Sequence, residues 1–326
     1  MFENIGVEWV GRCRNSRLTQ GDIQMLVFTT HNGRCVVHGV LALVGTHAIA
    51  TPFVTLRAKI LSTVWAKPGL VESAMDGPAQ LMHLDGLRKH IERALSDMLP
   101  ECDHQRRRVN AAMRYAVLTP GKRVRPMLAL LSAGQLGCPT AMAMPGALAL
   151  ELVHAASLVL DDLPCMDDAP ERRGQPSVHV RFGQDVAVLT GIALLNEAFA
   201  VISRATHLSE SARCEMIALL SRTVGLAGLV GGQDKDLLGA PPTPGLASEM
   251  HHEKTGVLFI ASVEMGALAA GAEPDVRAAL RAFGAELGLA FQAMDDLDDK
   301  DDIEDGRDRA NLISVLGVAG VRREAA

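Results

Sequence analysis

The chain has 326 residues with a formal net charge of −6, and 48% of its residues are hydrophobic. This apolar content is enough to build a large core, which excludes a disordered or collagen-like chain. Aromatic residues make up only 3% and no run of lysine or arginine stands out, so we expect no nucleic-acid partner. Six scattered cysteines without a CxxC pair indicate reduced thiols, and we predict a cytoplasmic protein.

Residues 1–75 show no sustained hydrophobic period, and we assign them no fold. They form an N-terminal extension. Either disorder or a start codon assigned too far upstream would explain the lack of a pattern in it. The apolar stretch 36–56 approaches the length of a membrane span, but it contains His38, His47 and Pro52 together with two glycines. We therefore predict no stable membrane anchor.

From Gln80 onward the hydrophobic pattern becomes helical. Apolar residues recur at spacings of three and four between Leu81 and Met98. Segments rich in alanine and leucine follow at 147–161, 186–203, 211–230, 248–270 and 276–296. Turn sequences such as TPG and GAPPTPG separate these segments. Residues 76–326 are therefore predicted to form one domain, an all-α bundle of about ten helices around a central cavity.

The strongest functional signal is a cluster of carboxylates at the end of an apolar helix, formed by Asp161, Asp162, Asp167 and Asp168. Pro164 is expected to end this helix just after the first two acids. A solvated acidic helix end is the alternative, but acids at a helix C-terminus oppose the helix dipole. Carboxylates in such an apolar setting therefore predict a cation nearby.

A second acidic cluster repeats this arrangement on another apolar helix. Gln292 precedes Asp295, Asp296 and Asp299 by three, four and seven positions, which places all four on one helix face. Two clusters of oxygen ligands favour Mg²⁺ over zinc or copper. The pair of clusters is a much stronger signal than either one alone.

Positively charged and polar side chains accompany the acids at three places in the chain. They are Lys122 and Arg125 at a predicted helix start, Arg172 and Arg173 just after the first acids, and Lys254 with Thr255. Each of these alone is typical of a protein surface. Together with metal-binding acids they predict a pocket for diphosphates, in which Mg²⁺ bridges phosphate and carboxylate oxygens.

In their order along the chain, these motifs resemble those of the trans-isoprenyl diphosphate synthases, and most closely the bacterial geranylgeranyl diphosphate synthases. The resemblance runs from about Gly86 to Gly320. Its motifs are GKRVRP, HAASLVLDDLPCMDD, ERRG, GGQDKDL, KTG and FQAMDDLDD. It implies an isoprenoid synthase-type bundle, a homodimer and two to three Mg²⁺ ions in each active site.

The resemblance also implies a role for each candidate residue. The Mg²⁺ ligands are Asp161 and Asp167, supported by Asp162, together with Asp295, Asp296 and Asp299 of the second motif. Isopentenyl diphosphate is bound by Lys122, Arg125, His154 and Arg173. The allylic diphosphate is bound by Arg172, Lys254, Thr255 and Gln292. Of these residues, the catalytic set is Asp161, Asp162, Asp167, Lys254, Asp295 and Asp296.

The implied reaction condenses isopentenyl diphosphate with dimethylallyl, geranyl or farnesyl diphosphate. Farnesyl-producing relatives carry an aromatic residue five positions before the first aspartate, where this chain has Ala156 followed by Ser157. These small side chains leave a deep tunnel beneath Asp161 and predict a C20 product, geranylgeranyl diphosphate. That product would serve carotenoid, diterpenoid hormone, chlorophyll or quinone synthesis, and the sequence does not choose among them.

Two alternatives stay open, a farnesyl diphosphate synthase and a non-catalytic regulatory subunit of a heteromeric prenyl synthase. A terpene cyclase is disfavoured, because the chain carries the cations expected for isopentenyl diphosphate. The sequence also departs from the family pattern after Asp299. The glycine-rich segment with its lysine is replaced by a short acidic stretch at 300–307, and the C-terminus is shortened.

Overall fold

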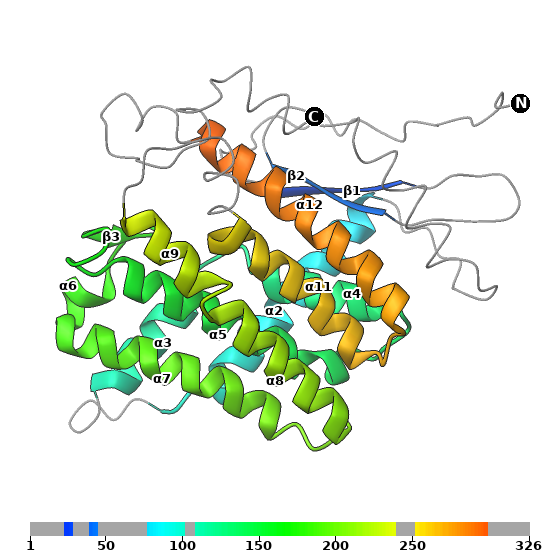
Figure 1. Ribbon diagram of the computed structural model, residues 1–326, viewed down its shortest axis with the longest axis horizontal. Coiled ribbons are helices and arrows are strands. Elements are labelled where there is room, and N and C mark those ends of the chain that lie inside the picture. Colours follow the sequence, from blue (N-terminus) through cyan, green and yellow to red (C-terminus); the bar gives the residue numbers. More distant parts are fainter. Residues whose placement is uncertain (1–22, 29–38, 45–76, 102–107, 239–251, 299–326) are drawn as a thin grey trace, which may run out of the picture.

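The computed structural model describes residues 23–28, 39–44, 77–101, 108–238 and 252–298 (Figure 1). Most of these residues are helical, which confirms the predicted all-α bundle. The helices are α2 (Gly77–Met98), α3 (Arg108–Leu118), α4 (Val124–Gln135), α5 (Thr140–Asp161), α6 (Val178–Phe182), α7 (Gln184–Ser203), α8 (Glu210–Val224), α9 (Leu229–Leu237), α11 (Val257–Ala269) and α12 (Pro274–Asp298). A π-helical turn, η1 (His252–Gly256), leads directly into α11.

Helix α5 is the centre of the bundle. It packs against α2, α3, α4, α7, α8 and α11, and nearly every residue between Ala143 and Ala156 is buried. Because apolar side chains surround the whole helix rather than forming one stripe, enclosure by other helices is the arrangement expected from its sequence. The carboxylates that follow Leu160 are therefore carried to one end of the core.

Glycines allow α11 to approach its neighbours closely. A Cβ atom placed on Gly146 of α5 would lie 2.2 Å from Cγ of Met265, and one on Gly266 would lie 2.3 Å from the carbonyl oxygen of Ala129 in α4. Both contacts are shorter than a side chain permits, so only glycine fits. A third close contact joins α12 to η1, because a Cβ on Gly288 would lie 2.9 Å from Cα of Gly256.

Two small antiparallel sheets add to the bundle. Strands β1 (Ile23–Phe28) and β2 (Gly39–Val44) pair with each other within the extension to which we assigned no fold. Strands β3 (Glu171–Arg172) and β4 (Gln175–Pro176) form a short hairpin after α5. The rest of the N-terminal extension and residues 299–326 lie outside the described residues, so the predicted domain boundaries stay predictions.

Three stretches of the described chain are long and apolar enough to cross a membrane, judged by length and composition alone: Thr140–Asp161, Gln184–Ser203 and Glu210–Leu237. In α5, 78% of the apolar window is buried inside the bundle, so the core explains its composition. In α7 the buried share is only 39%. Helix α7 therefore exposes apolar side chains that the described part of the chain does not cover.

Candidate active site

The first acidic cluster lies in the turn that follows α5. The helix ends at Asp161, before Pro164 as predicted, and Asp162 is its C-cap residue. The chain then turns back on itself, because the backbone N–H of Asp167 donates to the carbonyl oxygen of Asp161 at 2.9 Å. This hydrogen bond brings the first and third acids of the motif together at the edge of the core.

Burial and mutual repulsion disturb the ionisation of these two acids. Burial raises the pKa of Asp161 to about 6, with a further upward contribution from the charge of Asp167 and an opposing one from Lys254. Burial also raises the pKa of Asp167, which the ammonium of Lys254 opposes and the carboxylate of Asp236 reinforces. Two carboxylates that resist ionisation in this way favour a cation between them.

Lys254 reaches the acidic cluster from η1. Its Nζ donates to Oδ2 of Asp236 in α9 at 2.6 Å. Burial lowers the pKa of Lys254, but this hydrogen bond and the charges of Asp236, Asp161 and Asp167 outweigh it and raise the pKa above its usual value. The lysine is therefore held as a cation beside the acids.

Asp236 is a site residue to which the sequence analysis assigned no role. A second ion pair between α9 and η1, Lys235 Nζ to Glu253 Oε1 at 2.9 Å, holds the two elements together. A Cβ on Gly232 would lie 2.7 Å from the backbone nitrogen of Lys254, so the two backbones are in contact. The signal was present in GGQDKDL, where a pair of glycines precedes two acids on α9.

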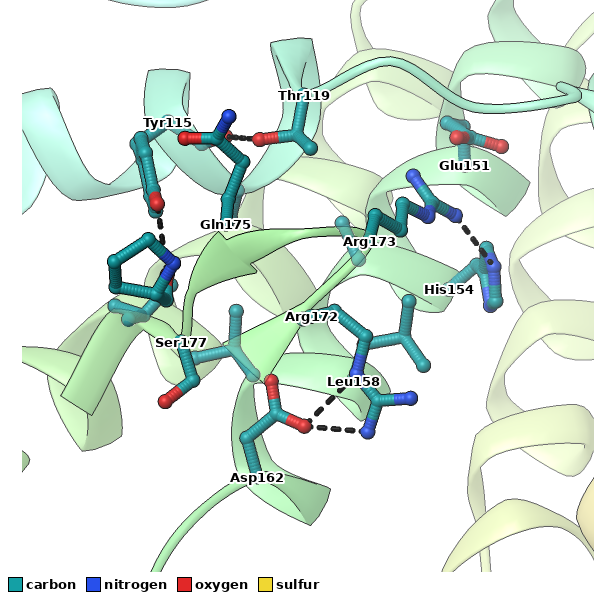
Figure 2. Close-up of a pocket in the computed structure, with 15 residues that line it drawn as sticks. Tyr115, Thr119, Glu151, His154, Leu158, Asp162, Arg172, Arg173, Gln175 and Ser177 are labelled. Atoms are coloured by element: carbon teal, nitrogen blue, oxygen red, sulfur yellow. Dashed lines mark hydrogen bonds and ion pairs between the residues drawn. The ribbon is translucent and has the colours of Figure 1, made fainter. Parts of the chain in front are cut away.

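His154 lies between two arginines. Its Nε2 is 3.4 Å from Nη1 of Arg125. The same nitrogen is 3.5 Å from Nη2 of Arg173 (Figure 2). Burial, and then the charges of Arg125 and Arg173, hold the pKa of His154 well below its usual range. Because guanidinium groups only donate, we assign Nε2 of the neutral ring as the acceptor and place its proton on Nδ1.

The two arginines of the β3–β4 hairpin have different partners. Nε of Arg172 donates to Oδ1 of Asp162 at 2.9 Å, and its Nη2 contacts the same oxygen (Figure 2). Asp162 is almost fully buried by this pairing. The carboxylate that we expected to support Mg²⁺ is therefore paired with Arg172, and this pair holds the hairpin beside α5.

The hairpin and α5 border a small pocket, with a volume of about 30 Å³. Tyr115 of α3 closes its far side by donating from its hydroxyl to the carbonyl oxygen of Pro176 at 2.7 Å (Figure 2). His154 and Asp162 line the same pocket, and Asp161 does not. The pocket therefore lies beside His154 rather than beside Asp161, and it has room for about one water molecule.

Helix α12 brings the second motif toward the same region. Phe291 packs on Phe259 of α11 with ring centroids 5.0 Å apart, and the guanidinium of Arg125 lies 5.1 Å above the Phe259 ring. Gln292 is the next residue of α12 and is half-buried. The backbone of α12 includes Asp295 and Asp296, whose side chains lie outside the described residues.

The other predicted site residues are also accounted for. Lys122 is exposed, Thr255 is half-buried in η1, and Asp299 lies outside the described residues. Ser157 lies one turn before Asp161 on the same face of α5, and its hydroxyl donates to the carbonyl oxygen of His154 at 3.0 Å. Ala156 is fully buried and Ser157 is half-buried, so the side chains at the predicted end of the tunnel are small.

The residues present fit Mg²⁺. Among the described residues, no group of three or more acidic, histidine or cysteine side chains is arranged to hold a metal ion. Mg²⁺ does not need such a cage, because it commonly binds through one or two carboxylates, several waters and the phosphates of a substrate. Asp161 and Asp167 supply two oxygen ligands of this kind, and the cations around them match phosphate.

Comparison with known proteins agrees with this geometry. A family model described as polyprenyl synthetase matches residues 106–306, more than half of the chain. The chain belongs to the polyprenyl synthetase family. It is 47% identical over 213 residues to a geranylgeranyl diphosphate synthase of Pantoea ananas, covering 64% of this chain and 70% of that protein. It is also 42% identical over 234 residues to one of Pseudescherichia vulneris, covering 70% and 75%.

Solved structures resemble this polyprenyl synthetase over most of its length. An apo FPP/GFPP synthase from Zymomonas mobilis has a TM-score of 0.70 and 34% identity, covering 75% of this chain and 87% of that one. A geranyltransferase from Helicobacter pylori, complexed with magnesium and isoprenyl diphosphate, has a TM-score of 0.68 and 29% identity, covering 78% and 88%. These similarities confirm the isoprenoid synthase-type fold.

The raised pKa of Asp161 predicts that the affinity of the synthetase for Mg²⁺ depends on pH. Without metal, its carboxyl should titrate near pH 6, because burial disfavours the charged form. Since a proton competes with Mg²⁺ for this group, affinity should weaken as the pH falls through about 6. Calorimetric titration with Mg²⁺ and pyrophosphate at several pH values between about 5 and 8 measures this effect.

Two variants control this measurement. Lys254→Met removes a charge that lowers the pKa of Asp161, so the midpoint should move upward. Asp85→Asn changes a surface acid that pairs with Lys89 and Arg88, and it should leave the profile unchanged. A Mg²⁺ affinity that is constant across the range would contradict the assignment.

Proposed function

We propose that this polyprenyl synthetase is a Mg²⁺-dependent trans-prenyltransferase that condenses isopentenyl diphosphate with allylic diphosphates to give geranylgeranyl diphosphate. The observation that carries the proposal is the presence of two separate sets of cations around one acidic cluster. Arg125 and Arg173 meet at His154, whereas Lys254 meets the acids from η1. Two sets of cations suit two diphosphates, and both relatives described above bear the name of this activity.

The residues divide between the two substrates. Lys122, Arg125 and Arg173 hold the diphosphate of isopentenyl diphosphate. The diphosphate of the allylic substrate is held by Arg172, Lys254, Thr255 and Gln292. Because the ring of His154 is neutral, it does not reduce the positive charge of Arg125 and Arg173 beside it. The positive charges stabilise the departing pyrophosphate, so the allylic carbon–oxygen bond breaks and leaves a delocalised carbocation.

The carbon–carbon bond then forms without a protein nucleophile. The double bond of isopentenyl diphosphate supplies the electron pair to the carbocation, and the released pyrophosphate accepts the proton lost from the adjacent carbon. The product is an allylic diphosphate longer by one isoprene unit. The role of the chain is to orient both substrates and to exclude water from the cation.

The metal would bind between the acids and the leaving group. Asp161 and Asp167 are the proposed ligands on the first motif, with Asp295, Asp296 and Asp299 on the second, for two to three Mg²⁺ ions. Bound there, Mg²⁺ would neutralise the negative charge that develops on pyrophosphate. Asp162 acts on Arg172 within this scheme, which agrees with the hydrogen bonds between them.

A second copy of the chain is the proposed occupant of the apolar face of α7. Val188, Leu189 and Ile192 are 41%, 53% and 58% exposed along this helix. Their spacing of one, three and four places them on one face, and an exposed stripe of this kind is typical of a homodimer interface. We place the protein in the cytoplasm as a soluble homodimer.

A product assay tests the proposed reaction. Purified protein with Mg²⁺, isopentenyl diphosphate and, separately, C5, C10 or C15 allylic diphosphate should give a C20 diphosphate, read by mass spectrometry. EDTA should abolish the product, because the leaving pyrophosphate then lacks its counter-ion. A C15 product would favour a farnesyl diphosphate synthase. No elongation by folded protein would favour a regulatory subunit.

Substitution of Ala156 tests the length of the tunnel. Ala156→Phe should shorten the main product from C20 to C15, because the ring fills the buried space beneath the acids. One helical turn is about 5.4 Å, close to the length of an isoprene unit. Ala156→Ser is the matched small substitution and should keep the C20 product. An unchanged C20 product from the phenylalanine variant would show that the tunnel ends elsewhere.

Substitution of Ile192 tests the interface. Ile192→Asp should convert the dimer to a monomer in light scattering, because it buries an unpaired charge in the contact. The control is Leu226→Asp, which changes an apolar side chain that is 85% exposed and lies outside α7. A wild-type monomer, or an equal effect of both variants, would contradict the proposed dimer face.

A further inference from the structure

The three cations of the GKRVRP motif point to different places. Lys122 is exposed, and Arg125 is half-buried beside His154. The side chain of Arg123, between them, is only 2% exposed. The first two are placed to meet a diphosphate, whereas Arg123 is directed into the core.

The guanidinium of Arg123 joins three elements. It donates to the carbonyl oxygens of Val117 at 2.8 Å and Thr119 at 3.0 Å, where α3 ends. It also donates to Oε1 of Glu151 in α5 at 2.5 Å. Arg123 is itself the N-cap residue of α4. One side chain therefore fixes α3, α4 and α5 relative to one another.

The backbone at Arg123 adopts a conformation that its side chain disfavours. Its φ of 52° and ψ of 35° lie in the left-handed region, which residues with a Cβ atom seldom occupy. Such a conformation persists where the surroundings hold it in place. This turn carries the chain into α4 and so sets the directions in which Lys122 and Arg125 leave it.

Glu151 connects Arg123 to the residues around His154. It is buried, and it lies three residues before His154, so both occupy one face of α5. Figure 2 shows Glu151, His154 and Arg173 close together beside the hairpin. A Cβ on Gly121 would lie 2.6 Å from Nη1 of Arg173, so the loop of Arg123 also touches this arginine.

We propose that the buried Arg123–Glu151 pair is a positioning device for the isopentenyl diphosphate subsite. It holds the loop of Lys122 and Arg125 in register with His154 and Arg173, and it contacts neither substrate. The inference rests on the proposed function. It adds two residues for which the sequence analysis named no role, one in the loop and one on the central helix.

The experiment uses conservative variants of the full-length chain. Arg123→Lys keeps the charge but lacks the planar fork that reaches three acceptors at once, and Glu151→Gln keeps the shape but lacks the charge. Each should raise the KM for isopentenyl diphosphate by about tenfold or more, because small displacements of a binding group are costly. The KM for the allylic diphosphate should stay within about twofold of wild type.

A matched control separates positioning from general stability. Arg281 and Glu264 form another arginine–glutamate pair, at 2.7 Å, which joins α12 to α11 and does not involve the α3–α4 loop. Arg281→Lys should leave both KM values unchanged. Thermal unfolding of every variant shows how much stability each loses, and the Arg123–Glu151 variants should change KM selectively even where the midpoints match the control.

Binding of isopentenyl diphosphate is also measured directly by calorimetry, with Mg²⁺ and a non-reactive farnesyl thiodiphosphate present. The proposal is supported if both variants bind isopentenyl diphosphate more weakly than wild type and if the double variant binds it no more weakly than the more affected single variant. Equal losses for both substrates, or a fall in stability with unchanged binding, overturn it. A wild-type chain that neither binds isopentenyl diphosphate nor elongates contradicts the proposed function itself, and this inference falls with it.

Discussion

The arrangement of this protein depends on one constraint, the cost of ending a largely buried helix in charged groups. Helix α5 runs through the core and ends at Asp161, which is half-buried, and at its C-cap Asp162, which is buried. A charge in such a place must be paired or must bind an ion. Asp162 is paired with Arg172. The positive charge of Lys254 stabilises the charged form of Asp161, which the carboxylate of Asp167 opposes. The hairpin after α5 and the turn before α11 are both held by these charges.

The opposite problem arises about two turns earlier along α5, where positive charge accumulates around His154. Arg123, Arg125 and Arg173 gather around His154, and Glu151 is the buried carboxylate of this group. Several arginines brought together in a core repel one another and favour an anion. The carboxylate of Glu151 offsets part of this charge through its pair with Arg123, and the remaining positive charge is what the proposed diphosphate subsite requires. The acidic cluster and the arginine cluster are thus both built around one helix, α5.

Much of this could be predicted from the sequence. The end of α5 at its first two acids follows from Pro164, and the start of α4 follows from the turn before it. The partner of Asp162 could not be predicted, because Arg172 is ten residues away and reaches it only through the turn and the β3–β4 hairpin. Asp236 was missed for the same reason, since its contact with Lys254 depends on how α9 packs on η1. Glu151 did leave a signal, as a lone carboxylate in an otherwise apolar run requires a partner.

The π-helical turn at Lys254 has a consequence for how the chain tolerates insertions and deletions. A π turn hydrogen-bonds over one residue more than an α-helix does, so it behaves as an α-helix with one residue inserted. Residues along an α-helix are rotated by about 100° from one to the next. Loss of a single residue in His252–Gly256 would therefore straighten the helix and swing Lys254 away from Asp236, although α11 itself would remain intact. The π turn thus sets the angular position of Lys254 beside the acids, and its length cannot change as loop lengths do.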